Sequence, residues 1–190
     1  MIISSRAYIL VGLPGSGKTT VGKALAQKLS VPFFDLDHLI EENFRVSIDT
    51  LIREGKESYF RLLELQSLKT FCQRVRPCRF VLATGGGTLN DPRNVRRLQS
   101  LGVWIYLQVE FEEIIRRLKE VNHALLTRHK ASDLENVLKE RVPYYKEAEL
   151  VVERTHPSPN ETCLEIWRKV YGQRGFQKNE KNEATAQSAA

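Results

Sequence analysis

Residues 12–19 read Gly-Leu-Pro-Gly-Ser-Gly-Lys-Thr and match the pattern G-x-x-x-x-G-K-[ST]. The apolar, β-prone run Ala7–Val11 stands before this octet, and Val21–Leu29 after it has the spacing of a helix. A strand, a glycine loop and a helix in this order direct backbone N–H groups and a helix dipole at one anion. The octet therefore predicts a phosphate-binding loop, the P-loop, between a buried parallel strand and a helix.

The positions of this loop have predicted roles toward ATP. Lys18 would reach the β- and γ-phosphates, and the Thr19 hydroxyl would ligate Mg²⁺. The other loop residues expected to contact ATP are Gly12, Gly15, Ser16, Gly17 and Thr20. A dinucleotide-binding fingerprint fits less well, because its sixth position, counted from Gly15, is Thr20 instead of glycine. A chance glycine-rich turn is the plain alternative, and both flanking segments argue against it.

Short apolar runs alternate with helical patterns along the chain. The predicted strands are Ala7–Val11, Pro32–Leu36, Arg79–Thr84, Val103–Val109 and Leu150–Glu153. The predicted helices are Val21–Leu29, Leu39–Arg53, Lys56–Val75, Asp91–Leu101, Phe111–Val121, Ser132–Tyr145 and Glu161–Tyr171, with Asp91 as N-cap and Pro92 in the first helical position. This alternation predicts a doubly wound α/β fold, with a five-stranded parallel sheet and helices on both faces.

The length of 190 residues suits a single domain, which we expect over residues 1–173. Gln177–Ala190 contains no large apolar residue, so residues 174–190 are expected to form a disordered tail. We expect no membrane span and no signal peptide, since apolar runs are short and the first strand begins close to Met1. Three cysteines without metal spacing favour a reduced, cytoplasmic compartment, and we expect a monomer.

The net charge of +6 is compatible with nucleic-acid binding, but the basic residues are scattered. No block of lysine and arginine interleaved with aromatic residues is present, so we expect no nucleic-acid partner. A solvated basic surface is one interpretation. A basic cleft that attracts a small anionic substrate is the more informative one.

Asp35 and Asp37 stand at the end of the second predicted strand. Residues at i and i+2 of a strand point to the same face, and this strand end borders the crevice beside the P-loop. One carboxylate could hold Mg²⁺ and the other could orient a substrate hydroxyl. The alternative is that Asp37 only caps the next helix and Asp35 is solvated.

Thr84-Gly85-Gly86-Gly87 ends the third predicted strand, where many P-loop proteins place an aspartate. Three residues without side chains leave room for a ligand against the main chain.

Arg61 interrupts the apolar side of one predicted helix, and Arg141 lies near the end of another. Each alone is typical of a surface arginine, but two beside one cleft would suit a bidentate grip on a carboxylate.

These residues together resemble the shikimate kinase family over about Tyr8–Pro159. The marks are GLPGSGKTT, Asp35-Leu-Asp37, Phe60-Arg61, Gly85-Gly86-Gly87 and Arg141-Val-Pro-Tyr-Tyr. The resemblance implies phosphoryl transfer from ATP to a hydroxyl of shikimate, with Mg²⁺ as cofactor.

The resemblance also implies roles for individual side chains. Asp35 would support Mg²⁺, and Asp37 would bind the ring hydroxyls and act as base or orienter. Arg61 and Arg141 would hold the substrate carboxylate, and the glycine turn would line the pocket. Residues that would sandwich the adenine are Arg117 and Pro159.

The chain departs from the family in the lid, expected at about 119–131. The family has Arg-Pro-Leu-Leu where this chain has His123-Ala124-Leu125-Leu126. A lid cation stabilises charge on the transferring phosphoryl group, and neutral histidine supplies none. His123 itself, or Arg128 or Lys130 further on, could serve. The alternatives are a weakened, shikimate-kinase-like binding protein, or another small-molecule kinase of gluconate or nucleotide type.

Overall fold

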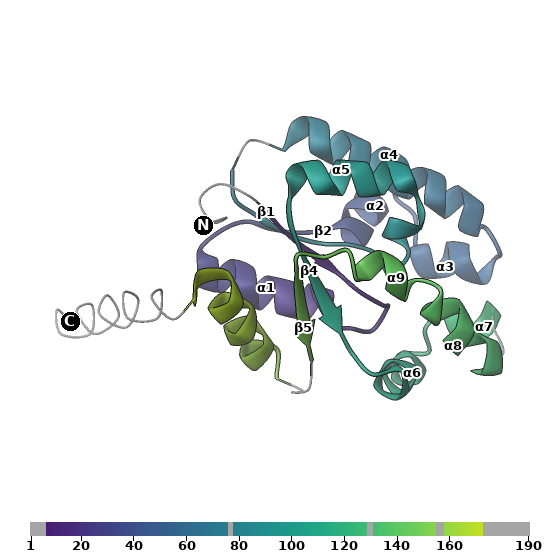
Figure 1. Ribbon diagram of the computed structural model, residues 1–190. Helices are drawn as coiled ribbons and strands as arrows, with labels where there is room; N and C mark the ends of the chain where they lie inside the picture. Colours follow the sequence, from purple (N-terminus) through teal and green to yellow (C-terminus); the bar gives the residue numbers. More distant parts are fainter. Residues whose placement is uncertain (1–6, 76–77, 129–130, 155–157, 173–190) are drawn as a thin grey trace, which may run out of the picture.

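A computed structural model describes residues 7–75, 78–128, 131–154 and 158–172 (Figure 1). Its sheet contains β1 (Ala7–Val11), β2 (Phe33–Asp35), β3 (Val81–Ala83), β4 (Gly102–Gln108) and β5 (Leu150–Glu153). The strands lie in the order β2-β3-β1-β4-β5, and every pair is parallel. The predicted five-stranded parallel sheet is thereby confirmed. Because β1 is central, the loop that leaves it opens between the carboxyl ends of β3 and β4.

Helices cover both faces of the sheet, as predicted for a doubly wound fold (Figure 1). Between the first and last strands lie the helices α1 (Lys18–Leu29), α2 (Leu36–Phe44), α3 (Ile48–Arg53), α4 (Glu57–Arg74), α5 (Pro92–Leu101), α6 (Phe111–Glu120), α7 (Leu125–Arg128), α8 (Ala131–Lys139) and α9 (Val142–Tyr145), with a 3₁₀ turn η1 (Thr88–Asn90). A further helix, residues 159–172, follows β5. We refer to it as the C-terminal helix.

The alternation of side chains along β1 divides the core into two layers. Ala7, Ile9 and Val11 belong to one buried cluster, which also contains side chains of α2, α4 and α5. Tyr8 and Leu10 point to the other, which is built with α1 and the C-terminal helix. Every residue of β1 is buried, so this strand is a fixed platform for the loop that follows it.

Two predicted helices are interrupted in the structure. The segment predicted as Leu39–Arg53 forms α2 and α3, because Arg45 adopts a left-handed conformation with φ of 53° and ends α2. Ser47 then starts α3 by accepting a 3.3 Å hydrogen bond from the Thr50 N–H. The segment predicted as Ser132–Tyr145 forms α8 and α9, which places Arg141 at the N-cap of α9. The predicted Asp91 cap and Pro92 start of α5 are confirmed.

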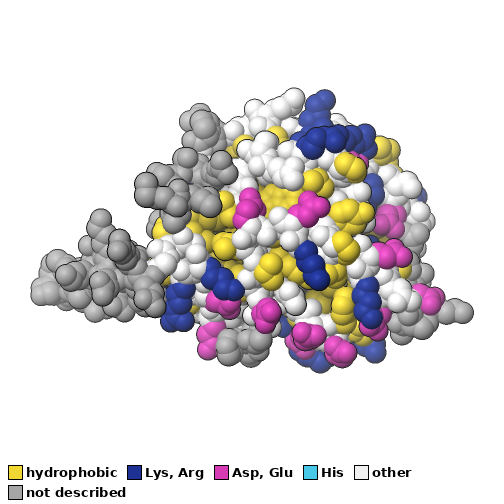
Figure 2. Space-filling model, in the orientation of Figure 1, with side chains coloured by type: hydrophobic (Ala, Val, Ile, Leu, Met, Phe, Trp, Pro, Cys, Tyr) yellow, Lys and Arg dark blue, Asp and Glu magenta, His cyan; other side chains and the backbone are white. Residues whose placement is uncertain are grey.

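The described surface carries mixed charges. Figure 2 shows basic and acidic side chains interspersed over most of the visible face, with a denser basic group over α4 and α5. Among the described residues, no helix has both the length and the apolar composition needed to cross a bilayer. The predicted tail, residues 174–190, lies outside the described residues.

Candidate active site

The P-loop lies between β1 and α1, where the sequence predicted it. Gly17 is the N-cap of α1 with φ of 88°, a left-handed conformation that favours glycine. Gly15 is likewise left-handed, with φ of 76°. The Ser16 N–H donates to Leu13 O at 3.1 Å and closes the turn. The glycines of the motif therefore permit the backbone to turn directly into the helix.

Lys18 is folded back into the loop. Its ammonium donates to Gly12 O at 2.9 Å and to Leu13 O at 2.8 Å, and it lies 3.4 Å from Ser16 Oγ. Only 7% of the residue is exposed, and burial lowers its pKa to about 8 although the charge of Asp37 opposes the shift. A buried ammonium beside carbonyl oxygens is the group that phosphate oxygens would attract.

Asp35 links the P-loop helix to the helix that follows β2. Its Oδ2 accepts a 2.6 Å hydrogen bond from the Thr19 hydroxyl. Its Oδ1 accepts from the Asp37 N–H at 3.0 Å and caps α2. The expectation that Asp35 and Asp37 share a strand face is wrong, because α2 begins at Leu36. The alternative is also wrong, since Asp35 and not Asp37 is the cap.

The pair formed by Thr19 and Asp35 suits a hard cation. Hydroxyl and carboxylate oxygens are ligands that Mg²⁺ accepts, usually with substrate phosphates completing its shell. Among the described residues, no group of three or more His, Cys, Asp and Glu side chains is arranged to hold a metal. The site therefore fits an ion shared with a phosphate chain better than an ion held by the protein alone.

The Oδ1 atom of Asp37 is buried and has no hydrogen-bond partner among the described residues. Burial, together with the negative charges of Glu64 and Asp35, raises the pKa of Asp37 to about 7, and the charge of Lys18 opposes the shift. A Cβ built on Gly85 would lie 2.8 Å from this oxygen, so Asp37 faces the glycine turn. An unsatisfied buried acceptor at this place is ready for a ligand hydroxyl.

The glycine turn Gly85–Gly87 lies between the two predicted arginines. On one side, a Cβ on Gly87 would overlap the Arg61 guanidinium. On the other side, Arg141 donates to Gly86 O at 3.2 Å. Tyr145 donates to the same oxygen at 2.5 Å. The structure thus brings Arg61, Arg141 and the glycines together, as the sequence predicted.

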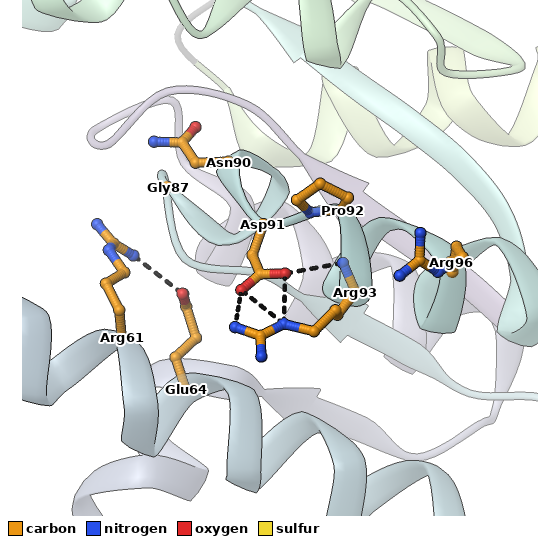
Figure 3. Close-up of a pocket in the computed structure, with 8 residues that line it drawn as sticks. All are labelled: Arg61, Glu64, Gly87, Asn90, Asp91, Pro92, Arg93 and Arg96. Atoms are coloured by element: carbon orange, nitrogen blue, oxygen red, sulfur yellow. Dashed lines mark hydrogen bonds and ion pairs between the residues drawn. The ribbon is translucent and has the colours of Figure 1, made fainter.

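Glu64 is a site residue that the sequence analysis missed. It is 1% exposed, pairs with Arg61 at 3.0 Å and accepts from the Thr88 hydroxyl at 2.7 Å. Figure 3 shows Arg61 and Glu64 rising from α4 toward Gly87, at the edge of a cavity of about 620 Å³ that extends to the start of α5. The i, i+3 spacing of Arg61 and Glu64 on a helix was the signal that could have revealed this pair.

Two arginines contact carbonyl oxygens of the P-loop. Arg117 of α6 donates to Gly15 O at 3.0 Å and to Glu113 at 2.6 Å. Arg154, which the sequence analysis missed, donates to Ser16 O at 2.9 Å. Pro159 is the first residue of the C-terminal helix. Arg117 therefore contacts the P-loop, and a sandwich of adenine between it and Pro159 stays a prediction.

The expected lid contains the end of α6, the short helix α7 and part of α8. Arg53 of α3 donates to the carbonyl oxygen of Asn122, so α3 contacts the start of this segment. Arg128 ends α7, but its side chain lies outside the described residues. Lys130 also lies outside them. The proposed replacements for the missing lid arginine are therefore not placed.

His123 is half-buried, and its Nδ1 accepts a 3.2 Å hydrogen bond from the Leu125 N–H. Burial lowers the pKa of the imidazole, an effect that Asp49 partly offsets and the charges of Arg53 and Lys18 reinforce. An Nδ1 that accepts a hydrogen bond carries no proton. His123 is therefore a neutral side chain near pH 7 in this arrangement.

Comparisons with known proteins agree with this geometry. A family model described as shikimate kinase matches residues 14–182. The shikimate kinase of Burkholderia thailandensis is 40% identical over 155 residues, which are 80% of this chain and 83% of that protein. The shikimate kinase of Persephonella marina is 34% identical over 85% of this chain and 96% of its own length.

Solved structures show the same likeness. The shikimate kinase of Acinetobacter baumannii, in complex with shikimate, superposes with a TM-score of 0.76 at 29% identity. The match covers 88% of this chain and 93% of that one. A gluconokinase from Sinorhizobium meliloti has a TM-score of 0.53 at 16% identity, which shows a shared fold alone. From its motif, its site geometry and these matches, the chain belongs to the shikimate kinase family.

Proposed function

We propose that this chain transfers the γ-phosphoryl group of ATP to a hydroxyl of shikimate and forms shikimate 3-phosphate. The observation that supports it most is the buried Asp37 Oδ1, which faces a glycine turn set between Arg61 and Arg141. A ligand with a hydroxyl for Asp37 and a carboxylate for the two arginines would satisfy all three groups. Shikimate carries both functions on one small ring.

The proposed reaction uses positioning and charge more than covalent chemistry. The loop amides and Lys18 bind the phosphate chain, and Thr19 with Asp35 would hold Mg²⁺. When bound, that ion neutralises charge on the phosphate oxygens. Asp37 orients the substrate hydroxyl and receives its proton as the new O–P bond forms. The bond from the γ-phosphorus to the bridging oxygen breaks, and ADP leaves with that oxygen.

Further parts of the proposal concern the setting of the enzyme. Arg117 and Pro159 would hold the adenine, and a lid over residues 119–131 would close on the substrates. Lysine and arginine are mixed with acidic residues over the visible face, which supports small-molecule partners over nucleic acid (Figure 2). A cytoplasmic monomer is the simplest state for such an enzyme, with ATP and Mg²⁺ both supplied from solution.

Two other functions remain as alternatives. A gluconate- or nucleotide-type kinase shares the fold, but it would not need two arginines at the glycine turn. A weakly catalytic binding protein is suggested by the neutral His123 in the lid. Asp37, Lys18 and the arginines support the active enzyme over this second alternative.

ADP release with an acceptor panel tests the proposal. Shikimate, gluconate and AMP are compared at equal concentration, with ATP and Mg²⁺ present and with no acceptor as the baseline. Only shikimate should stimulate ADP release. Stimulation by gluconate or AMP alone would overturn the acceptor assignment. Calorimetric binding of shikimate without any turnover would instead favour the binding protein.

A further inference from the structure

Arg154 connects the end of the sheet to the P-loop. It follows β5 directly, and its backbone N–H donates to Gln108 O at 2.8 Å, which fixes its Cα beside the end of β4. Its guanidinium crosses to the loop, where Nη1 donates to Ser16 O at 2.9 Å. The two residues are 138 positions apart in the sequence. Arg154 is not part of any of the motifs on which the family resemblance was based.

The contact between Arg154 and the loop is close and partly shielded from water. A Cβ placed on Gly17 would overlap the guanidinium, so the arginine packs directly on this residue. Burial lowers the pKa of Arg154, and the charge of nearby Arg117 lowers it further while Glu113 opposes the shift. Two cations therefore contact two successive carbonyl groups, Arg117 that of Gly15 and Arg154 that of Ser16.

The geometry of the peptide bond makes this contact consequential for phosphate binding. The carbonyl of Ser16 and the N–H of Gly17 belong to one peptide unit, and the described residues contain no cis peptide. In a trans peptide the two groups point in opposite directions. A donor that fixes the direction of the Ser16 oxygen therefore also fixes the direction of the Gly17 N–H.

A glycine at this position makes such a restraint useful. Gly17 has φ of 88°, and glycine also populates many other conformations at little cost. Without a partner on the Ser16 oxygen, the peptide between Ser16 and Gly17 could rotate away from the phosphate chain. A charged donor on the carbonyl also polarises the amide, which strengthens its N–H as a donor to an anion.

We propose that Arg154 is a positioning residue, which holds the Ser16–Gly17 peptide so that the Gly17 N–H is directed at the phosphates of the nucleotide. The inference rests on the proposed function only in assigning ATP to the P-loop. Arg154 acts through the P-loop, so its loss should affect the binding of the phosphate chain and not the binding of the base or of the acceptor. Loss of Arg154 should therefore weaken ADP and ATP binding more than adenosine or shikimate binding.

The test compares Arg154→Ala and Arg154→Lys with wild type, and uses Lys69→Ala as a matched control. Lys69 is an exposed cation on α4, outside the proposed lid and the P-loop, and its loss changes the net charge equally. ADP is titrated without acceptor, adenosine is measured by competition, and Tm is recorded for each variant. Arg154→Ala should weaken ADP binding about tenfold, the order expected for a charge-assisted hydrogen bond. Arg154→Lys should recover part of the loss, and adenosine binding should change less than about twofold.

Three results would overturn the inference. Equal losses for adenosine and ADP would mean that Arg154 contacts the base or ribose. A fall in Tm without a change in ADP affinity would mean a structural role alone, and an equal effect of Lys69→Ala would mean a general charge effect. If Arg154→Ala does not fold, the inference is tested on Arg154→Lys, by the ratio of its affinities for ADP and adenosine compared with that of wild type. ADP is titrated without shikimate, so this test does not depend on the acceptor. If the wild-type protein binds ADP but does not phosphorylate shikimate, the proposed function is refuted and this inference is not.

Discussion

The Thr19 hydroxyl donates a 2.6 Å hydrogen bond to Asp35 Oδ2, and this bond joins the helix of the P-loop to the carboxylate that caps α2. The residue proposed to ligate Mg²⁺ from the loop and the residue proposed to support it from β2 are thus already in contact. Because Asp35 also caps a helix, its metal role and its structural role can be separated by substitution.

Asp35→Asn keeps a capping oxygen but removes the charge, whereas Asp35→Ala removes both. Both variants should need about tenfold more Mg²⁺ for half-maximal activity, since one carboxylate ligand is lost. Only Asp35→Ala should also lose about 1 kcal/mol of stability from the lost cap. The checks are Mg²⁺ titrations at fixed ATP and unfolding curves. An unchanged Mg²⁺ requirement in both variants would remove Asp35 from the metal site.

Arg61→Ala and Arg141→Ala should weaken shikimate binding by roughly 1.5–3 kcal/mol each, the range for hydrogen bonds to charged groups. ADP binding should change much less, since both arginines lie at the glycine turn. Calorimetric titration of each variant with shikimate and with ADP measures the two losses of affinity separately. Arg96→Ala is the matched control, because Arg96 lines the same cavity as Arg61 (Figure 3) but has no proposed role. A larger loss for ADP than for shikimate would show that the roles are reversed.

The raised pKa of Asp37 predicts an acid limb in the activity. Burial raises this pKa to about 7 in the free enzyme, and the ionised carboxylate is the form that accepts the proton. The kcat/KM for shikimate should therefore rise with pH up to about 7. Asp37→Asn should lose most activity and the acid limb with it. A wild-type profile flat from pH 5.5 to 8, measured at constant ionic strength, would contradict this role.

The raised pKa of Asp37 also predicts that its contribution to stability falls as pH rises, whereas activity rises over the same range. A carboxyl group whose pKa is higher in the folded than in the unfolded protein stabilises the fold at low pH. That contribution is lost as pH rises from about 4 toward 7. Asp37→Asn has no such group, so its Tm relative to wild type should increase between pH 5 and pH 8. A constant or decreasing difference would mean that the carboxylate is not desolvated.

His123 offers a gain-of-function prediction. Its imidazole is neutral near pH 7, because burial lowers its pKa and Nδ1 accepts a hydrogen bond. If no other lid residue supplies the charge, His123→Arg should raise kcat, since a permanent cation would face developing negative charge. ATP affinity should change less than kcat. Equal kcat values for wild type, His123→Arg and His123→Ala across a pH series would place residue 123 outside the site.

Removal of Gln177–Ala190 should leave activity unchanged and Tm within about 2 °C, because the segment lacks large apolar side chains to bury. Thermal unfolding and ADP release of the truncated chain are the measurements. A large decrease in Tm would show that this segment packs on the domain.

The sequence predicted most of the fold because the signals were local. The P-loop is a contiguous motif, and the strands are apolar runs in a chain that alternates them with helices. The break after α2 was not predictable, because Arg45 adopts a left-handed conformation that usually signals glycine. The cap at Asp35 was misassigned for a similar reason, since two aspartates near one strand end are equivalent candidates in sequence.

Site residues were predictable from the sequence where the residue type itself suggests the chemistry, as at Lys18 or Arg141. Residues were missed where their role depends on a contact between segments that are distant in the sequence. Arg154 reaches Ser16 across the folded sheet, and no sequence spacing encodes that contact. The place of Glu64 in the site is visible only in the structure, where the Thr88 hydroxyl of η1 donates a hydrogen bond to its side chain. Tertiary contacts of this kind follow from the fold and become visible only in the structure.

The most direct measurement of the central claim is the mass of the product formed from shikimate and ATP under single-turnover conditions, with enzyme in excess. Wild type should convert shikimate to a singly phosphorylated product and yield one ADP for each. Lys18→Met, with an unchanged circular dichroism spectrum, should form none, because the cation that meets the β- and γ-phosphates is lost. Absence of phosphorylated shikimate from wild type, or its formation by Lys18→Met at the wild-type rate, would contradict the account.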